Sequence, residues 1–528
     1  MKTPVKKVIL PLDQMLGEQA RRFSRKTLVK FEGKKYSYQE MDRLASVFAT
    51  YLLERGLRRG DRIAILSCNC HEYIAAYFGI IRAGGCVLPV NNMLAHEEVD
   101  FILQDAGVTT VFFDGECSNT VHKLRQRDRD SRQYHSLAET VQKSSPSGPF
   151  PEFPRSDPDD VSTILYTSGT TGRPKGALLT HRNIVSNALA SNEVIHISAK
   201  DRFVVFLPLF HSFTYTVCVV LPLLRGSMIS LLPGVRPFQR VVKSLILDRI
   251  TLFVAIPTVY KILADKNMPF FIKLLLNLRL CVSGAAPLPV KVIRDFEAAF
   301  KVPLLEGYGL TEASPVVSIN PLEKGMSKPG TVGKPLPGIE VKIVDDAGAP
   351  LPVGTPGELI VKGPNVIKGY LNRPEDTAKT IKDGWLFTGD IASLDDDGYI
   401  KIIDRKKDLI IVDGLNVYPY EVEEVLYRHP AVKDCSMIGV AHEHDEGKEL
   451  GIMYVVLQEG KSANQKDLRE YLSEHVAHFK IPRRFIFTEE LPRTATGKIM
   501  KKELRVWYRG SAFSSASTIP RISLSDQE

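Results

Sequence analysis

The stretch from Tyr166 to Gly176, YTSGTTGRPKG, constrains the fold of this chain more than any other segment does. It has few bulky side chains, so its backbone can approach a ligand closely. It follows the apolar run Val161–Leu165, which predicts a buried strand. The stretch holds the hydroxyl residues Tyr166, Thr167, Ser168, Thr170 and Thr171 and the glycines Gly169, Gly172 and Gly176. Glycine lets the backbone turn closely around a ligand, with free N–H groups facing it. Lys175 adds a compact positive charge. We therefore expect a strand and then a loop that wraps a polyphosphate.

Two other interpretations of this loop can be weighed from the sequence. It is not a Walker A loop, since no Gly-x-x-x-x-Gly-Lys-Ser/Thr spacing occurs in it. A flexible Gly/Thr linker remains an alternative on composition alone. The motifs further along the chain weigh against the linker.

The bulk composition excludes several classes of protein. The chain has 528 residues, 44% of them hydrophobic and 25% charged, which is typical of a globular protein with a large core. The net charge is +8, but Lys and Arg are spread widely, so we expect no nucleic-acid partner. A basic surface permits peripheral contact with anionic lipid without indicating it.

The cysteines and the apolar runs bear on the compartment. Seven cysteines include no Cys-x-x-Cys and no zinc-ligand spacing, and Cys218 and Cys281 lie in apolar segments. This is typical of buried thiols in a reducing compartment. The N-terminal stretch is too interrupted for a signal peptide, and Pro222 breaks the apolar run 217–224. We expect a cytoplasmic protein.

The first 110 residues alternate strand and helix signals. Residues 26–38 predict two short strands turned at Glu32-Gly33, and Ser37 with Glu40 forms a capping box for a helix that Gly56 closes. Strands at 62–67 and 86–90 then flank a helix at 72–83. The rhythm predicts parallel sheets covered by helices.

The remaining chain divides into three parts. Residues 144–149 are typical of an exposed connector, after which strands are expected at 203–207, 252–255 and 280–282. Short runs such as 340–344 and 358–362 predict a small antiparallel sheet or barrel. From near Lys407 we expect an α+β unit with helices at 418–426 and 465–476 and strands at 435–440 and 452–457. The serine-rich residues from 510 predict a disordered tail.

Four further segments carry polar residues suited to a nucleotide. Small residues at 283–287 follow a predicted strand and leave room for a flat ligand, although a tight turn fits equally well. In 306–312, Tyr308 can stack on a base, and Thr311 beside Glu312 suits phosphate and Mg²⁺. Asp390, with Arg405 following, offers a carboxylate for ribose, though such an Asp is more often a turn residue. Lys498 lies on a polar turn that can enter another site.

Together these segments resemble the adenylate-forming superfamily of acyl-CoA synthetases, adenylation domains and luciferases. The resemblance runs in order from about residue 25 to 505. It implies an α/β fold with a large N-terminal domain of stacked, mostly parallel sheets plus a small β-barrel-like subdomain. A small mobile α+β domain would follow, giving boundaries of 1–406, 407–509 with a hinge at Lys407, and a disordered tail at 510–528.

The resemblance also implies roles for individual residues. Thr167 to Lys175 would hold the β- and γ-phosphates of ATP, and Thr311 the α-phosphate, while Glu312 would bind Mg²⁺. Lys498 would stabilise charge as pyrophosphate leaves, and the loop 413–416 would serve the later thiol step. The adenine and ribose would contact Gly284, Ala285, Ala286, Glu306, Gly307, Tyr308, Gly309, Asp390 and Arg405. Asp404 departs from the family, where a glycine often precedes this arginine, which leaves the local geometry open.

The acyl side follows from the segment 207–213, LPLFHSF, in which His211 is a candidate for positioning a carboxylate. A packed histidine at a strand end is the alternative. Residues 214–224 are apolar and medium-sized, and no charged residue interrupts them, which favours a hydrophobic tunnel wall over an amino-acid site. Thr214 stands where fatty-acyl enzymes often have glycine, which would narrow the tunnel.

The expected activity is ATP-dependent ligation of a medium- or long-chain fatty acid to CoA through an acyl-adenylate. An acyl-carrier-protein synthetase, an aromatic-acid CoA ligase and a non-catalytic acyl- or nucleotide-binding protein are the alternatives. The acid, ATP and CoA would be the small-molecule partners. The oligomeric state is left open, a homodimer included.

Overall fold

The computed structural model describes residues 9–128, 132–143, 149–168, 174–265, 270–412, 415–441, 449–494 and 497–512. The predicted connector at 144–149 therefore lies almost entirely outside the described residues. The chain divides into two compact units, one of residues 1–388 with 392–402 and one of residues 389–391 with 403–528. This division falls close to the expected boundary at Lys407, whose role as a hinge stays a prediction.

A six-stranded sheet forms one layer of the first unit, in the order β6-β5-β3-β4-β7-β8. Its strands are β3 (Arg62–Leu66), β4 (Cys86–Val90), β5 (Thr110–Phe113), β6 (Gln133–Ser136), β7 (Val161–Ser168) and β8 (Pro174–Thr180). The pairs among β3, β4, β5, β6 and β7 are parallel, and β8 returns antiparallel to β7. The glycine-rich stretch thus joins the two strands of a hairpin, with its predicted strand confirmed.

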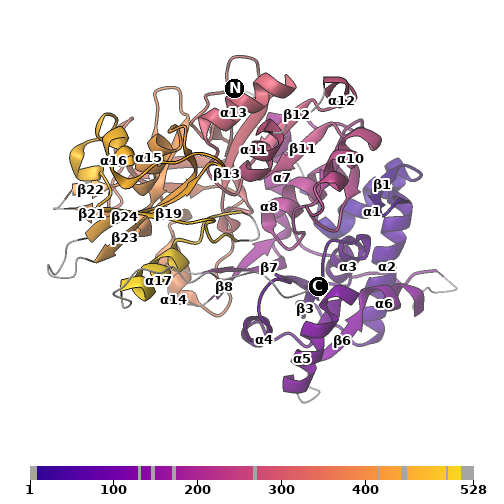
Figure 1. Ribbon diagram of the computed structural model, residues 1–528. Coiled ribbons are helices and arrows are strands. Elements are labelled where there is room, and N and C mark those ends of the chain that lie inside the picture. Colours follow the sequence, from indigo (N-terminus) through magenta and orange to yellow (C-terminus); the bar gives the residue numbers. More distant parts are fainter. Residues whose placement is uncertain are drawn as a thin grey trace, which may run out of the picture. The chain divides into compact units, whose positions relative to one another are not determined.

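A nine-stranded sheet has the order β15-β14-β13-β12-β11-β9-β10-β1-β2 (Figure 1). Its middle strands are parallel: β9 (Arg202–Val205), β10 (Met228–Leu231), β11 (Leu252–Ala255), β12 (Leu280–Ser283) and β13 (Leu304–Gly309). The strands β14 (Val316–Ile319) and β15 (Lys334–Pro335) extend it antiparallel at one end. At the other end lie β1 (Thr27–Phe31), parallel to β10, and β2 (Lys34–Ser37). The predicted hairpin at 26–38 is confirmed, but it joins this sheet and not the one that β3 begins.

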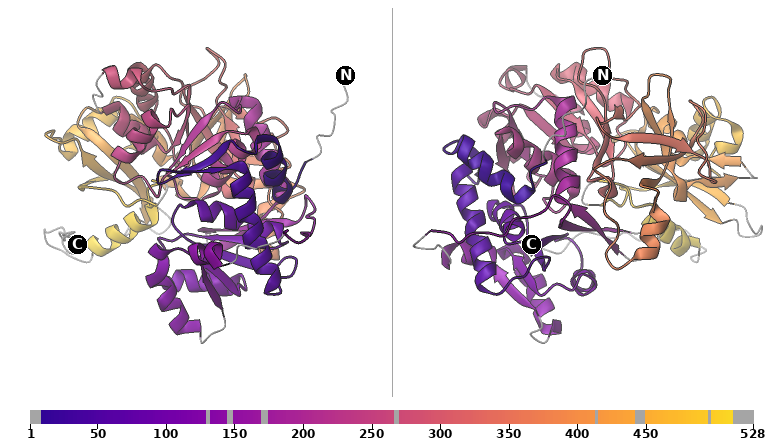
Figure 2. Two further views of the ribbon diagram at one scale, coloured as in Figure 1. Left: turned by 90° about the vertical axis from the view of Figure 1, so that its right-hand side faces the viewer. Right: turned by 180° about the vertical axis from the view of Figure 1, so that it is seen from behind.

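Helices α1 (Leu12–Phe23), α2 (Tyr38–Glu54) and α3 (His71–Arg82) pack together (Figures 1 and 2). The predicted capping box at the start of α2 is present, with the Glu40 N–H donating to Ser37 Oγ at 3.1 Å. A Cβ on Gly79 of α3 would lie 2.5 Å from Phe48 Cβ, so glycine allows the close approach of α2 and α3. The other helices over these sheets are α4 (His96–Asp105), α5 (Ser118–Asp128), α6 (Leu137–Lys143), α7 (His181–Ile195), α10 (Gln239–Leu247), α11 (Pro257–Asp265), α12 (Phe270–Leu274) and α13 (Val290–Phe300).

The apolar stretch expected to form a tunnel wall is helical and lies in the main core. It consists of α8 (Ser212–Tyr215), a π-helical turn at Thr216–Val220 and α9 (Leu221–Arg225). Val217, Cys218 and Leu221 belong to the apolar cluster shared by both sheets. In the described residues no helix is long and apolar enough to cross a membrane.

The predicted small antiparallel sheet is also present. It pairs β16 (Glu340–Val344) with β17 (Gly357–Lys362), and adds β18 (Ile381–Lys382), β19 (Trp385–Leu394) and β20 (Ile400–Arg405), with α14 (Pro374–Thr380) between them in sequence. The chain enters the second unit at Gly389 within β19 and returns to the first unit at Ala392. It enters the second unit again at Ile403, within β20.

The second unit has the expected α+β content. A sheet of β23 (Val432–Ala441), β24 (Glu449–Leu457) and β25 (Arg484–Phe487) and a hairpin of β21 (Ile410–Val412) and β22 (Leu415–Val417) accompany helices α15 (Pro419–Leu426), α16 (Gln465–Ser473) and α17 (Lys501–Ala512). Helix α17 includes Gly510–Ala512, which corrects the first residues of the predicted disordered tail. Leu504, near the start of the same helix, is fully buried in an apolar cluster. The rest of that tail lies outside the described residues.

Candidate active site

The predicted phosphate loop connects β7 to β8 of the hairpin. Thr167 and Lys175 face each other across the two strands. The loop residues Gly169, Thr170, Thr171 and Gly172 lie outside the described residues, as does the side chain of Ser168. Lys175 Nζ pairs with Asp376 Oδ1 of α14 at 2.8 Å and lies 5.7 Å from the centre of the Tyr370 ring. The predicted lysine is therefore held at the mouth of the loop.

Glu312 links this hairpin to the segment that follows β13. It lies in a short 3₁₀ turn, Thr311–Ala313. Its Oε1 accepts hydrogen bonds from Thr167 Oγ1 at 3.2 Å and from the Tyr370 hydroxyl at 3.0 Å. Burial, and then the Glu312 carboxylate, raise the pKa of Tyr370, so its phenol stays protonated and donates. No sequence motif marks Tyr370, and the only local signal is the glycine, Gly369, that precedes it.

The glycines around Tyr308 are required by strand packing. A Cβ on Gly309 would lie 2.1 Å from the Pro315 carbonyl oxygen, and one on Gly307 would lie 3.2 Å from that of Ser318. The backbone before β14 therefore excludes a side chain at Gly309, and the close approach of β14 leaves little room for one at Gly307. Tyr308 between them is half-buried and reaches the surface of the main core.

Glu306, predicted among the nucleotide contacts, packs against the turn that follows β12. It is buried, and its Oε1 accepts the backbone N–H of Leu288 at 3.0 Å. Its carboxylate thus ties β13 to the turn that carries Gly284, Ala285 and Ala286. Ala285 has a left-handed backbone with φ of 68°. Glu306 thus helps to fix the segment 284–286, which was predicted to contact adenine, relative to β13.

The segment around His211 meets two of the other predicted segments. Ser212 Oγ lies 3.3 Å from Thr311 Oγ1. A Cβ on Gly284 would lie 2.9 Å from the Phe213 ring, so the ring packs directly on this glycine. The structure therefore brings together Thr167, Lys175, Gly284, Thr311 and Glu312 with the segment that begins at His211.

The imidazole of His211 is uncharged. It occupies the N-cap position of α8, where Nδ1 accepts the Phe213 N–H at 3.3 Å. Burial lowers the pKa of His211 to about 4, so at neutral pH its one proton resides on Nε2. His211 caps a helix, as the packed-histidine alternative expects, and still has a free donor to offer.

Asp390, Arg405 and Lys498 lie near one another in the second unit. Arg405 Nε is 3.4 Å from Asp390 Oδ1. Burial, and then the charge of Arg405, lower the pKa of Lys498 to about 7, against the opposing effect of Asp390. Asp404, the departure from the family pattern, is buried and accepts the N–H groups of Arg405 and Tyr420 at 2.7 and 2.8 Å. It fastens the start of α15 to β20.

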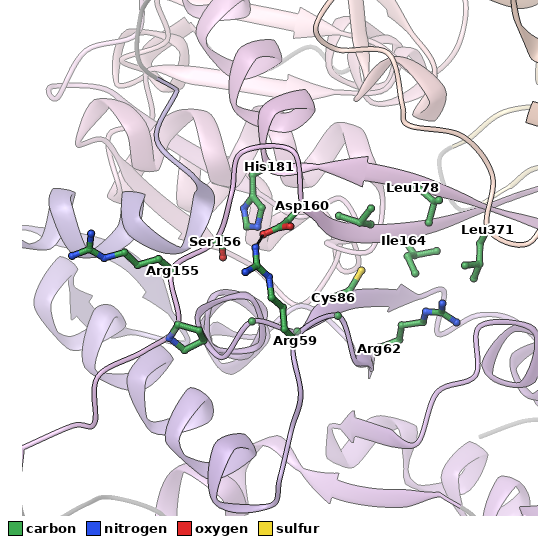
Figure 3. A pocket seen from close by; sticks show the side chains of 15 residues that line it. Arg59, Arg62, Cys86, Arg155, Ser156, Asp160, Ile164, Leu178, His181 and Leu371 are labelled. Atoms are coloured by element: carbon green, nitrogen blue, oxygen red, sulfur yellow. Dashed lines mark hydrogen bonds and ion pairs between the residues drawn. The ribbon is translucent and has the colours of Figure 1, made fainter.

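A separate cavity of about 270 Å³ opens at the start of β4 and β7 (Figure 3). It contains none of the predicted site residues. Arg59 already pairs with Asp160, and Arg62 donates to the Ala106 carbonyl at 2.7 Å. His181 Nδ1 accepts the Leu12 N–H at 3.1 Å. Arg59, Arg62 and His181 are thus already engaged with protein groups, and the cavity is not the predicted site.

The described residues include no group of three or more His, Cys, Asp or Glu side chains arranged to hold a metal ion. Glu312 stands as a single carboxylate beside hydroxyl groups. Mg²⁺ commonly takes one or two carboxylates and completes its shell with phosphate oxygens and water, so a single carboxylate fits it.

Two family profiles match the chain. One is described as AMP-binding enzyme and matches residues 16–371, and the other as AMP-binding enzyme C-terminal domain and matches residues 421–498. The chain is 33% identical to a long-chain-fatty-acid–CoA ligase of Bacillus subtilis, covering 93% of this chain and 94% of the relative. It is 35% identical to a feruloyl-CoA synthase of an Amycolatopsis species, covering 92% of this chain and 97% of the relative.

Two solved structures share the fold of this chain over most of its length. The ATP-bound MatB of Rhodopseudomonas palustris superposes with a TM-score of 0.87 at 30% identity, covering 94% of this chain and 99% of that chain. The o-succinylbenzoate CoA synthetase of Bacillus subtilis with its acyl-adenylate superposes with a TM-score of 0.83 at 29% identity, covering 93% and 97%.

Proposed function

Because the chain belongs to the AMP-binding enzyme family and is an acid–thiol ligase, we propose that it joins a medium- or long-chain fatty acid to CoA. The observation that carries the fatty-acid assignment is the buried, uncharged helical stretch after His211, in which Thr214, Val217 and Cys218 are almost fully enclosed. Such a stretch leaves no partner for a charged substituent on the acid. The similarity to a long-chain-fatty-acid–CoA ligase supports this assignment.

An aromatic acid is the second candidate substrate. The feruloyl-CoA synthase is as similar to this chain as the fatty-acid ligases are. Tyr215 of α8 also stacks on Tyr77 with ring centres 3.8 Å apart, which makes the surroundings of this stretch rich in aromatic rings. A flat acid would pack well there.

In the first half-reaction a carboxylate oxygen attacks the α-phosphorus of ATP, and pyrophosphate leaves. We assign Thr167, Ser168 and Lys175, with the loop between them, to the β- and γ-phosphates, and Thr311 to the α-phosphate. Tyr308 and the small residues of 284–286 would enclose the adenine, and Asp390 and Arg405 would hold the ribose. The Thr167–Glu312 and Ser212–Thr311 contacts support one shared site for the phosphate roles within the first unit.

His211 would position the attacking carboxylate. Since Nδ1 is occupied by the Phe213 N–H, Nε2–H is left to donate to the acid. A neutral imidazole orients the carboxylate without neutralising its charge, so the oxygen keeps its nucleophilic character.

Glu312 would hold Mg²⁺ together with the phosphates. The metal would offset negative charge on the phosphate oxygens when bound. Tyr370 and Thr167 orient the carboxylate by donating to Oε1, which leaves Oε2 for the metal.

Lys498 would act only in this first half-reaction. Its positive charge would lie beside the α-phosphate and the carboxylate of the acid and stabilise their negative charge. In the second, the thiol attacks the acyl carbon and AMP leaves, after a rotation about Lys407 that withdraws Lys498. With a pKa of about 7, Lys498 loses its charge as the pH rises, so kcat/KM for ATP should fall above about pH 7.

The variant Lys498→Ala tests this division of labour. We expect acyl-adenylate formation to fall about 100-fold or more, since a preorganised charge in a reaction site is worth that much. Thioester formation from supplied acyl-adenylate should stay close to the wild-type rate. Equal losses in both half-reactions, measured by single turnover, would remove Lys498 from its assigned step.

The acid and the thiol are identified by pyrophosphate release from ATP with fatty, aromatic and amino acids, each with and without CoA. Sustained release with fatty acids and CoA supports the proposal and ranks the chain lengths. Sustained release with aromatic acids instead selects the second candidate. A single-turnover burst that CoA does not relieve would indicate an acyl-carrier protein as the thiol.

A further inference from the structure

Asn69 joins the two large sheets of the first unit at the edge where the candidate site lies. It occupies the loop between β3 and α3 and is only 4% exposed. Its Nδ2 donates to the carbonyls of Leu207 at 3.0 Å and Leu232 at 3.1 Å, and its Oδ1 accepts the Leu209 N–H at 2.9 Å. One side chain from the loop after β3 of the six-stranded sheet is thus bonded to the segments that follow β9 and β10 of the nine-stranded sheet.

The loop that presents Asn69 is itself held in place. The Cys68 N–H donates to Asp114 Oδ2 at 2.7 Å, in the turn after β5. Cys70 caps α3 by accepting the Tyr73 N–H on its sulfur at 3.4 Å. Anchors on both sides of Asn69 therefore fix its amide relative to the six-stranded sheet.

The segment that Asn69 holds leads directly to His211. Asn69 grips Leu207 and Leu209, and the turn closes when the His211 N–H donates to the Pro208 carbonyl at 3.2 Å. Two residues span at most about 7 Å, so a shift at Leu209 reaches His211 with little slack. The imidazole has its own anchor in the Phe213 N–H. The hydrogen bonds of Asn69 thus fix the backbone that leads to His211, and the Phe213 N–H of α8 fixes the imidazole ring.

We propose that Asn69 is a positioning residue for the acid substrate and acts through His211. It makes no contact with the reacting atoms in this assignment. It sets the distance between the six-stranded sheet and the Nε2–H that meets the carboxylate. The proposal rests on the role of His211 under the proposed function.

The variant Asn69→Ala leaves two buried carbonyls and one buried N–H without partners, so the segment 207–211 is expected to relax. The KM for the acid should rise about tenfold, while the KM for ATP stays within about twofold of wild type. Asn69→Asp keeps the acceptor for Leu209 but turns a carboxylate oxygen toward two carbonyls, and should show the same selective loss. Asn69→Ser, which retains one hydrogen-bonding group, serves if the alanine variant does not fold.

Asn183 provides a matched control. It is also a buried asparagine whose Nδ2 donates to two carbonyls, those of Pro364 and Val366 at 2.8 and 2.9 Å. Its Oδ1 accepts one backbone N–H, that of Thr180, at 2.8 Å. Asn183→Ala should lower the unfolding temperature about as much as Asn69→Ala, with no change in the KM for the acid.

A double-mutant cycle with His211→Ala decides whether Asn69 acts through His211. If it does, the double variant should have the same acid KM as His211→Ala alone. Additive losses, equal rises in the KM values for acid and ATP, or the same acid effect in Asn183→Ala would each overturn the proposal. An unchanged acid KM in His211→Ala would instead overturn the role of His211 and, with it, the route by which Asn69 acts.

Discussion

At the scale of single residues, some side chains that form hydrogen bonds to the candidate site residues or to the segment before His211 belong to no recognisable sequence motif. Tyr370 and Asn69 both act through hydrogen bonds made across long stretches of sequence, to Glu312 and to Leu207–Leu209. The polar motif residues could be predicted because glycine, hydroxyl and carboxylate groups gather locally in the sequence. A lone tyrosine or asparagine has no such local pattern, and its partner is known only once the chain has folded.

The Tyr370 hydroxyl can be tested by Tyr370→Phe. The change removes one of two hydrogen bonds to Glu312 Oε1 and keeps the ring that lies near Lys175. A hydrogen bond to a charged group is worth about 1.5–3 kcal/mol, so kcat/KM for ATP should fall at least about tenfold. The loss should shrink at high Mg²⁺, since a loosened carboxylate still binds metal at higher concentration.

Tyr399→Phe is the control for that measurement. The Tyr399 hydroxyl also donates to one protein oxygen, the Met326 carbonyl, but away from Glu312. If Tyr399→Phe lowers kcat/KM for ATP as much as Tyr370→Phe does, the effect is one of general stability and Tyr370 does not orient Glu312.

At the scale of elements, local pattern predicted the strands and helices well but not which strands pair. The capping box at Ser37 and Glu40 marks the start of α2, and 86–90, 252–255 and 340–344 are strands with the predicted bounds. The hairpin β1–β2 nevertheless pairs with β10, about 200 residues away in sequence, and not with the sheet of β3. Alternation of apolar residues reveals that a strand exists, whereas its neighbour depends on burial that only the whole fold decides.

Packing of β13 against the turn before β14 makes a prediction at this scale. Gly309→Ala would put a Cβ 2.1 Å from the Pro315 carbonyl oxygen, so the strands must separate. We expect a loss of about 3 kcal/mol or more in the free energy of unfolding, together with weaker ATP binding because Thr311 and Glu312 follow directly. Urea unfolding and ATP titration measure the two effects.

Gly234→Ala is the matched control, because a Cβ there would meet no atom within 4 Å. It should leave both the unfolding free energy and ATP binding close to wild type. A Gly309→Ala variant as stable as Gly234→Ala would mean that this glycine is not required by the strand pair.

At the scale of the whole molecule, the sequence predicted two units and a change of unit near Lys407, because the short antiparallel runs of 340–362 are followed there by an α+β pattern. It did not predict that β19 and β20 each pass between units, since a strand looks the same on both sides of such a boundary. The six- and nine-stranded sheets lie within the first unit, and so do the groups that meet around Glu312.

The stability of this first unit should depend on pH through a buried histidine. His181 is 2% exposed, and its Nδ1 accepts the N–H of Leu12 at the start of α1. Burial lowers the pKa of His181 to about 4, from an ordinary value of 6.5. Below pH 6.5 the imidazole therefore binds a proton in the unfolded chain but stays neutral in the folded chain. The stability that the neutral His181 contributes is complete above pH 6.5 and is lost as the pH falls toward 4. From pH 6.5 to 5 the loss is about 2 kcal/mol.

The variant His181→Asn isolates this contribution, because the amide oxygen can still accept the Leu12 N–H but does not titrate. Its free energy of unfolding should fall about 2 kcal/mol less than that of the wild type between pH 7 and pH 5, measured by urea unfolding at the two values. His211, with a pKa lowered to about 4 by the same cause, remains in both proteins and should leave a residual pH dependence in the variant. Parallel pH profiles for the two proteins would mean that His181 has the same pKa in the folded chain as in the unfolded chain, so that burial of a neutral imidazole does not contribute to the pH dependence.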